Sequence, residues 1–173
     1  DPNRRGGVGG SYRFSDRLLG DAEVSYGDGG PGVRAGTEFQ ESAETRRYVN
    51  YSLDNERAVD GQHARQGRLT SGFRSLISDS ASLYQEDRLQ HGGGSNGLSR
   101  ALGMSWSPSE QWTFGADWET GTLVDRRTQA ETERNAGGGR VSYRLDPLFV
   151  SSGIEYRFDD QEQPDGSRSQ RTT

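Results

Sequence analysis

The most constraining feature of this 173-residue chain is a regular alternation of apolar and polar side chains. In residues 112–119, every second side chain is apolar, and those between are polar or glycine. Successive side chains of a β-strand point to opposite faces, so the pattern predicts strands with one apolar and one polar face. Ten segments are predicted strands on this basis: 6–14, 18–26, 32–40, 46–53, 67–77, 81–89, 97–106, 111–120, 139–145 and 148–158.

The composition excludes several classes of protein. Only 28% of the residues are hydrophobic, whereas soluble domains commonly have ~45–50% apolar residues. An ordinary globular enzyme with a thick apolar centre is therefore not expected, and no apolar run is long enough to predict a membrane-spanning helix. All 21 basic residues are arginine and the net charge is −5, so we expect no nucleic-acid partner. Cysteine is absent, which excludes disulfides and thiol catalysis.

The polar faces of the predicted strands combine small residues with charges of both signs. A soluble sandwich also alternates, but glycine, serine and mixed charges suit the crowded interior of a closed barrel. In a wide barrel the charges would line a wet lumen and influence the passage of ions or solutes, and in a narrow one they would form ion pairs that fill it. The candidate lumen-lining charges are Arg13, Glu23, Arg34, Glu38, Asp117, Glu119, Arg144, Glu155 and Arg157.

The predicted connections alternate between tight turns and long polar stretches. Tight turns are expected near residues 15–17, 41–45, 78–80, 107–110 and 146–147, where Ser, Asp and Pro are frequent. Long connections are expected at 54–66, 87–96, 121–138 and 159–173. This arrangement is typical of outer-membrane barrels, which have short periplasmic turns and longer external loops. Residues beside the tight turns are predicted to form an aromatic girdle at one membrane interface: Phe14, Trp106, Trp112 and Phe149.

Two motifs carry a resemblance at the family level. The segments MSWSPSEQWTF (104–114) and VSYRLDPL (141–148) place aromatic and apolar residues around a tight turn. With the alternation over most of the chain, they resemble the outer-membrane β-barrel proteins of Gram-negative bacteria. The resemblance implies an all-β, antiparallel up-and-down meander of about ten strands that forms part of a transmembrane β-barrel. It also implies a lipid bilayer as partner.

Ten strands with periplasmic tight turns would leave both ends of residues 1–173 on the external side. Complete single-chain barrels keep both ends in the periplasm. We therefore expect residues 1–173 to be a single barrel segment and an internal section of a longer chain.

Three functions are compatible with the sequence. The first is a porin-like channel or structural envelope protein in the bacterial outer membrane. The second is a binding module that contacts a ligand or another cell through loops such as 54–66 and 121–138. The third is a self-assembling extracellular fibre in which strands with open edges stack as cross-β. Self-association or contact with other envelope proteins is compatible with the first function. We expect no enzymatic activity, cofactor or metal.

Three motifs are interpreted as parts of loops. Residues 93–97 match the G-x-S-x-G nucleophile motif beside His91, but no helix is predicted after them, as a nucleophile elbow requires. Residues 27–32 match G-x-G-x-x-G but precede a predicted strand, which favours a turn over a dinucleotide site. Four carboxylates in 159–165 lack the spacing of an EF-hand, so a solvated acidic loop is favoured over a calcium site.

Overall fold

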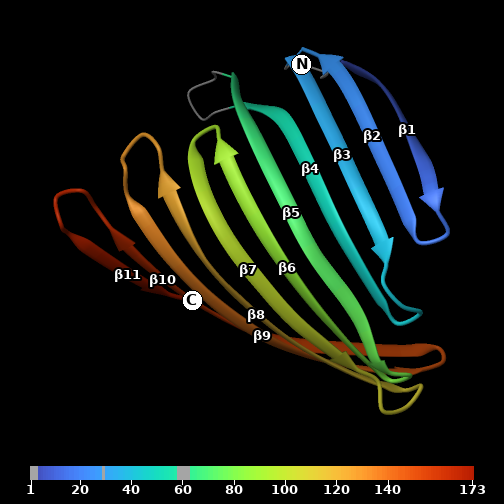
Figure 1. The fold of residues 1–173 in the computed structure, drawn as a ribbon. Coiled ribbons are helices and arrows are strands. Elements are labelled where there is room, and N and C mark those ends of the chain that lie inside the picture. The colour runs from blue at the N-terminus through green and yellow to red at the C-terminus, as the bar shows by residue number, and fades with distance from the viewer. Residues whose placement is uncertain (1–3, 29, 58–62) are drawn as a thin grey trace.

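In the described residues, the protein forms one antiparallel β-sheet of eleven strands that follow their order in the sequence, β1 to β11 (Figure 1). The computed structural model describes residues 4–28, 30–57 and 63–173. No helix in these residues is long and apolar enough to cross a membrane. The strands are β1 (Arg5–Ser15), β2 (Leu18–Gly27), β3 (Gly30–Gln40), β4 (Thr45–Arg57), β5 (His63–Ser78), β6 (Ala81–Gly92), β7 (Ser95–Trp106), β8 (Trp112–Asp125), β9 (Glu131–Leu145), β10 (Leu148–Glu162) and β11 (Arg168–Thr172).

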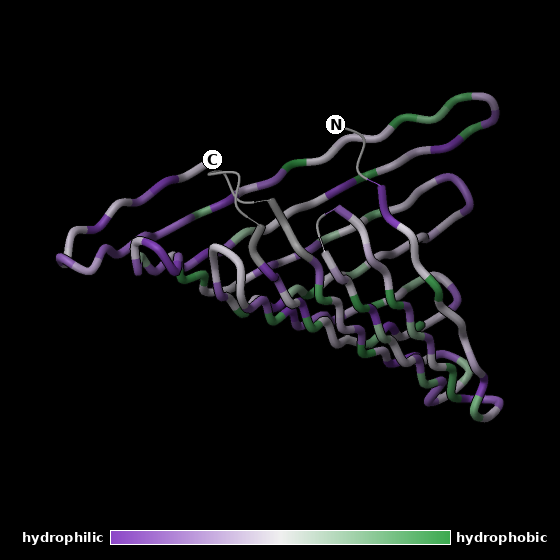
Figure 2. Tube along the Cα trace, turned by 90° about the horizontal axis from the view of Figure 1, so that it is seen from above, coloured by the Kyte–Doolittle hydropathy of each residue, from purple (hydrophilic) through white to green (hydrophobic). Residues whose placement is uncertain are grey.

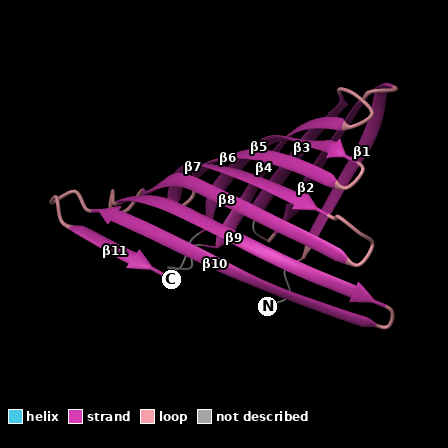
Figure 3. Ribbon diagram, turned by 90° about the horizontal axis from the view of Figure 1, so that it is seen from below, coloured by secondary structure: helices cyan, strands magenta, loops and turns pink. Residues whose placement is uncertain are grey.

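The all-β, up-and-down arrangement expected from the alternation is confirmed, and each predicted strand corresponds to one of β1–β10. The sheet is an open one, because β1 pairs only with β2 and β11 only with β10. Seen from below, β1 and β11 lie at opposite margins of the curved sheet (Figure 3).

The expectation of long polar loops is wrong where the structure describes them. Most of the expected loop 121–138 is strand, with only residues 126–130 between β8 and β9. Only residues 93–94 separate β6 from β7, and the expected loop 159–173 contains the end of β10 and the additional strand β11. Of the expected loop 54–66, residues 58–62 lie outside the described residues, and the rest belongs to β4 and β5. These strand ends were missed because the apolar alternation is lost there while the backbone ladder continues: 131–135 and 159–162 are polar on both faces, and Leu123 and Val124 are adjacent apolar residues.

The strands are staggered in one direction across the sheet. Leu18, the first residue of β2, begins a row of register partners that passes through Arg47 and Leu102 and reaches Tyr156 of β10. Tyr156 lies eight residues beyond Leu148, the first residue of β10 (156 − 148 = 8). The offset therefore averages one residue per strand over the eight steps from β2 to β10. Each strand is thus displaced by ~3.3 Å along its length for every ~4.8 Å across the sheet. If the tight turns lie at one level, the strands are inclined by about 35° to the normal of that level.

The sheet has almost no apolar core. Among the described residues, only Ala101 and Ala130 are buried apolar side chains. Large apolar residues are open instead, with Val8 72% and Ile154 78% exposed. Apolar and polar residues alternate along the strands, and polar residues predominate at the β10–β11 hairpin (Figure 2). The sheet is a single layer, and no second layer of the described residues covers either side. The alternation therefore places the apolar residues on one uncovered face and the polar residues on the other.

On β7 the two faces differ in exposure. On one face of β7, every second residue from Asn96 to Trp106 is exposed, and most of these are apolar. On the other face, every second residue from Ser95 to Ser105 is half-buried or buried. We call these the apolar face and the polar face. A soluble protein shields its apolar side chains, so this arrangement is the reverse of what water favours.

Hydrogen exchange tests the strand ends that the sequence does not predict. Thr122 pairs with Leu98 on one side and Glu133 on the other. We therefore expect the amides of residues 122–124 to exchange at least about tenfold more slowly than those of the turn at 126–129, measured by mass spectrometry or NMR of the folded protein. Equal rates in the two segments would contradict the observed extent of β8.

Candidate functional site

All nine predicted lumen-lining charges lie on the polar face. The register pairs Glu23 with Arg34 and places Glu38 opposite Tyr48, and the other charges keep the same phase on their strands. The structure does not gather the nine into one cluster, because they are spread over six strands. Four ion pairs include one or two of them: Arg46–Glu38 at 3.1 Å, Arg88–Glu119 at 3.9 Å, Arg34–Asp54 at 3.9 Å and Arg157–Glu155 at 4.0 Å.

The centre of the polar face holds a chain of polar contacts that crosses several strands. The Tyr48 hydroxyl on β4 donates to Glu86 Oε2 on β6 at 2.6 Å, and Glu86 also accepts from Arg88. Arg88 in turn lies 3.9 Å from Glu119 on β8. The side chain of Glu86 is only 19% exposed, so its charge is partly withdrawn from water and is balanced by these partners.

A second ion pair extends the polar contacts to β10. Arg134 on β9 donates to both carboxylate oxygens of Asp159 on β10, at 2.9 and 3.4 Å. These two residues are 30% and 21% exposed. We call this pair and the Tyr48–Glu86–Arg88–Glu119 chain together the central network; the two groups are separate, and their residues lie on strands between β4 and β10. Such cross-strand pairs hold neighbouring strands in one register.

Long polar side chains lie flat along the polar face. Tyr48 passes over Gly72 of β5 to reach Glu86, and a Cβ at Gly72 would lie 2.8 Å from the Tyr48 hydroxyl. Tyr84 lies over Gly103 of β7 in the same way, and any Cβ there would collide with its ring. Because glycine has no side chain, it lets these rings approach the backbone and keeps them against the sheet.

A hollow of about 700 Å³ remains on the polar face beside the central network. Its lining offers hydrogen-bond donors and acceptors together with charges of both signs, from residues such as Tyr48, Asn50, Arg68, Thr70, Glu86 and Arg134. Such a lining suits water and small polar solutes. It does not suit an apolar ligand, because the charged groups would lose solvation without replacement.

Three of the four predicted girdle residues share the apolar face. Phe14 contacts Tyr12, with ring centroids 5.0 Å apart, and its ring lies against Gly20. Trp112 stacks on Phe114 with ring centroids 5.9 Å apart, and Trp106 lies tilted against the same ring at 5.6 Å.

Phe149 does not lie with the other three. It pairs with Arg144 on the polar face, and the guanidinium lies 5.6 Å from its ring centroid. Its place follows from the tight turn at residues 146–147, which makes Leu148 the apolar-face partner of Leu145 and leaves Phe149 on the opposite face. Position beside a turn is thus not enough to assign a residue to the girdle.

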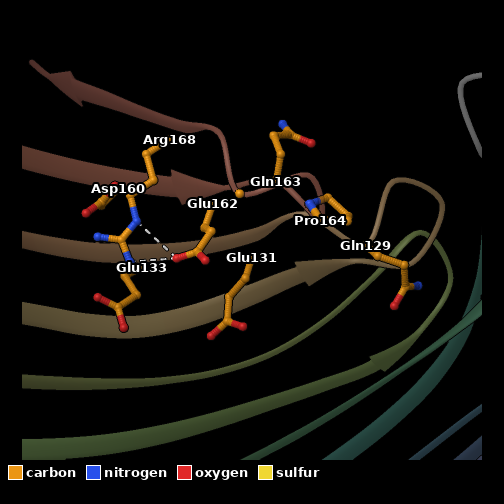
Figure 4. A pocket seen from close by; sticks show the side chains of 9 residues that line it. Gln129, Glu131, Glu133, Asp160, Glu162, Gln163, Pro164 and Arg168 are labelled. Carbon is orange, nitrogen blue, oxygen red and sulfur yellow. Dashed lines mark hydrogen bonds and ion pairs between the residues drawn. The ribbon is translucent and has the colours of Figure 1, made fainter.

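The acidic segment 159–165 is divided between two faces and a turn. Asp159 binds Arg134 on the polar face, whereas Asp160 and Glu162 lie on the other face. Figure 4 shows Glu162 bound to Arg168, which donates to Oε2 from Nε at 3.1 Å and from a terminal nitrogen at 2.7 Å. Asp165 accepts from the side chain and backbone of Ser167, and these bonds lower its pKa.

The hollow beside these acids has a volume of about 430 Å³ and includes Glu131 and Glu133 of β9 (Figure 4). In the described part of the chain, no three His, Asp or Glu side chains are arranged to hold a metal ion.

The G-x-S-x-G segment forms the turn and first residues of a strand. Ser95 begins β7, and its hydroxyl accepts a hydrogen bond from Gln90 Nε2 at 2.9 Å. The His91 ring stacks on Tyr51 at 6.0 Å. The serine and the histidine thus contact different partners, and a strand follows the serine where a nucleophile elbow needs a helix.

The residues of the central network other than Glu119 were missed at the sequence level. Arg134 and Asp159 fall in segments expected to be loops, and Glu86 is an ordinary polar position in its strand. One signal was present: in the predicted strand 46–53, Tyr48 falls on the face opposite Tyr51. A partly buried tyrosine hydroxyl usually has a hydrogen-bond partner, and the partner of Tyr48 is Glu86.

Comparisons with protein-family models, with curated proteins and with solved structures found no significant match. The functional argument therefore depends on the faces, register and contacts described above.

Substitution of Gly103 tests the close approach of Tyr84. Gly103→Ala should displace the Tyr84 ring and lower the free energy of unfolding by about 1–3 kcal/mol, as overpacking does. Gly115→Ala on β8 is the matched control, because a Cβ there meets only atoms at 3.9 Å. Urea unfolding in detergent micelles provides the measurement, and equal effects of the two substitutions would contradict the proposed contact.

The central network makes a second stability prediction. Glu86→Gln removes the charge that Tyr48 and Arg88 share, so we expect a loss of about 1–3 kcal/mol in the free energy of unfolding. Glu162→Gln is the control, because its pair with Arg168 is more than half exposed on both sides and should contribute at most ~1 kcal/mol. A larger effect at Glu162 in the same unfolding assay would refute the importance of the network.

Proposed function

We propose that this chain forms part of the wall of a transmembrane β-barrel in the outer membrane of a Gram-negative bacterium. The apolar face contacts lipid, and the polar face lines the interior. The observation that carries this proposal is the distribution of the large apolar side chains: they gather on one face of the sheet, and most of them are exposed there. A bilayer is the surrounding in which such a sheet is favoured, since its outside must be apolar.

The extent of the apolar face along the strands supports the proposal. On β10, apolar-face residues from Leu148 to Phe158 are almost all apolar, and the next two on that face are Asp160 and Glu162. These ten steps (158 − 148 = 10), at ~3.3 Å each and an inclination of about 35°, give a height of about 27 Å. The apolar band of known outer-membrane barrels is ~25 Å tall.

The stagger of the strands gives independent support. Closing a sheet into a barrel requires strands inclined by ~35–45° and a constant register shift. The inclination of about 35° derived from the register agrees with this range. Aromatic residues lie beside several of the tight turns, as Phe14, Phe39 and Trp112 do. They would therefore lie at one level in an inclined barrel, as an interfacial girdle does.

Within this class we favour a porin-like channel over a filled structural barrel. Tyr48 and Tyr84 lie flat on the polar face over glycines, which leaves the hollow beside the central network open. A water-filled interior with charges of both signs would pass small polar solutes.

The other two functions have less support. A fibre of the cross-β type stacks flat strands, whereas this sheet is curved and steadily staggered. Recognition through long loops lacks its main basis, because the connections at that end are short wherever the structure describes them.

Cysteine scanning tests the orientation of the two faces, since the native chain has no cysteine. Fluorescent labels at Leu98→Cys and Leu102→Cys should be quenched by spin-labelled lipid in vesicles. Labels at Ser99→Cys and Ser105→Cys, on the other face of the same strand, should be quenched less by lipid and more by aqueous iodide. The reverse pattern, or equal quenching of all four, would refute membrane insertion. Planar-bilayer conductance of the same protein distinguishes an open channel from a filled barrel.

A further inference from the structure

A row of polar side chains crosses the apolar face, and Gln85, Thr122 and Glu133 adjoin it on the same face; the Gln85 amide donates to Asp87 at 3.3 Å. Five consecutive register partners on β5 to β9 carry hydrogen-bonding side chains, between Val49 on β4 and Phe158 on β10. We call this set the polar row; it consists of Ser71, Asp87, Arg100, Thr120 and Asn135.

An ion pair lies at the centre of the polar row. Arg100 donates to both carboxylate oxygens of Asp87, at 2.6 Å from Nε and 3.4 Å from a terminal nitrogen. The Arg100 side chain remains 58% exposed. Along β7 the arginine is flanked on the same face by Leu98 and Leu102, so it lies among apolar residues and not at the end of the strand.

Such a pair is costly if hydrocarbon covers it. The guanidinium has five N–H donors, and Asp87 accepts only two of them. Acyl chains offer no acceptor for the remaining donors, and ionisable groups that face lipid are rare for this reason. Thr120 and Asn135 add further groups that acyl chains leave unsatisfied. The polar row therefore calls for a polar occupant.

We propose that the polar row is the contact between two copies of this chain in the membrane. The inference rests on the proposed membrane function and identifies a partner for it. The argument is charge complementarity: the ion pair has one positive and one negative group, side by side on adjacent strands. An anionic lipid headgroup would match Arg100 and repel Asp87.

Two-fold symmetry fits this arrangement. Asp87 and Arg100 are direct register partners, so they lie at nearly the same level of an inclined barrel. Two copies inserted in the same direction can be related by an axis along the membrane normal that passes between these residues. Asp87 of each copy then faces Arg100 of the other, which gives a ring of four alternating charges. Self-complementary contacts of this kind are typical of symmetric dimers.

A charge-swap experiment tests the contact. The protein would carry donor or acceptor dyes at Ser80→Cys in a tight turn, and energy transfer between copies would be measured in vesicles as lipid is added. Asp87→Arg alone and Arg100→Asp alone place like charges opposite each other, so each should weaken self-association at least about tenfold. A mixture of the two single variants should associate as wild type does, because the introduced arginine of one chain then faces the introduced aspartate of the other. The double variant, which exchanges the two charges, should also associate.

Recovery in the mixture separates a contact between copies from a folding defect, because each chain in it still carries its own substitution. Absence of association in wild type, or association that ignores the charge variants, would overturn the proposal. An anionic lipid retained by wild type and released by Arg100→Asp, without association, would overturn it in favour of a lipid occupant. The period-two quenching pattern is measured on the same samples. If that pattern is present, failure to associate refutes the contact alone, and if it is absent, the membrane proposal and the contact both fail.

Discussion

The structure depends on the pairing of polar side chains with one another on one face of the sheet. In a soluble sheet the apolar side chains would supply the driving force by leaving water. Here they stay exposed, and the organised interactions within the sheet are the backbone ladders and the central network around Glu86 and Arg88. The free energy of burial for the apolar face must therefore come from surroundings outside the sheet.

The stagger supports the proposed membrane setting of the two faces. Each strand is displaced by about one residue relative to its neighbour, so rows of register partners run obliquely to any line through the tight turns. The apolar residues follow the line of the tight turns and so cross those rows, and the acids Asp160 and Glu162 lie just beyond the apolar band at the end of β10. Strand inclination, band height and girdle position are thus three consequences of one register.

The two faces differ in whether their polar groups are satisfied within the sheet. On the polar face, Gly72 and Gly103 let Tyr48 and Tyr84 lie flat, which keeps the polar groups satisfied without filling the hollow. On the apolar face, the Asp87–Arg100 pair has no such accommodation and stays exposed. The Tyr48 hydroxyl finds its hydrogen-bond partner within the sheet. The Asp87–Arg100 pair has donors that only a group outside the sheet can satisfy.

The sequence alone determined the local properties: strand identity, the phase of the nine predicted charges and an apolar face. These follow from the alternation, because the direction of a side chain in a strand depends only on the position of its residue. The ends of β8, β9 and β10 were missed because the apolar alternation is lost there. Tertiary structure alone decided the register, and with it the stagger, the Tyr48–Glu86 contact, the Asp87–Arg100 pair and the place of Phe149 on the polar face. Those features depend on which residues of neighbouring strands lie opposite each other, and the alternation within one strand is the same for any register that preserves its two faces.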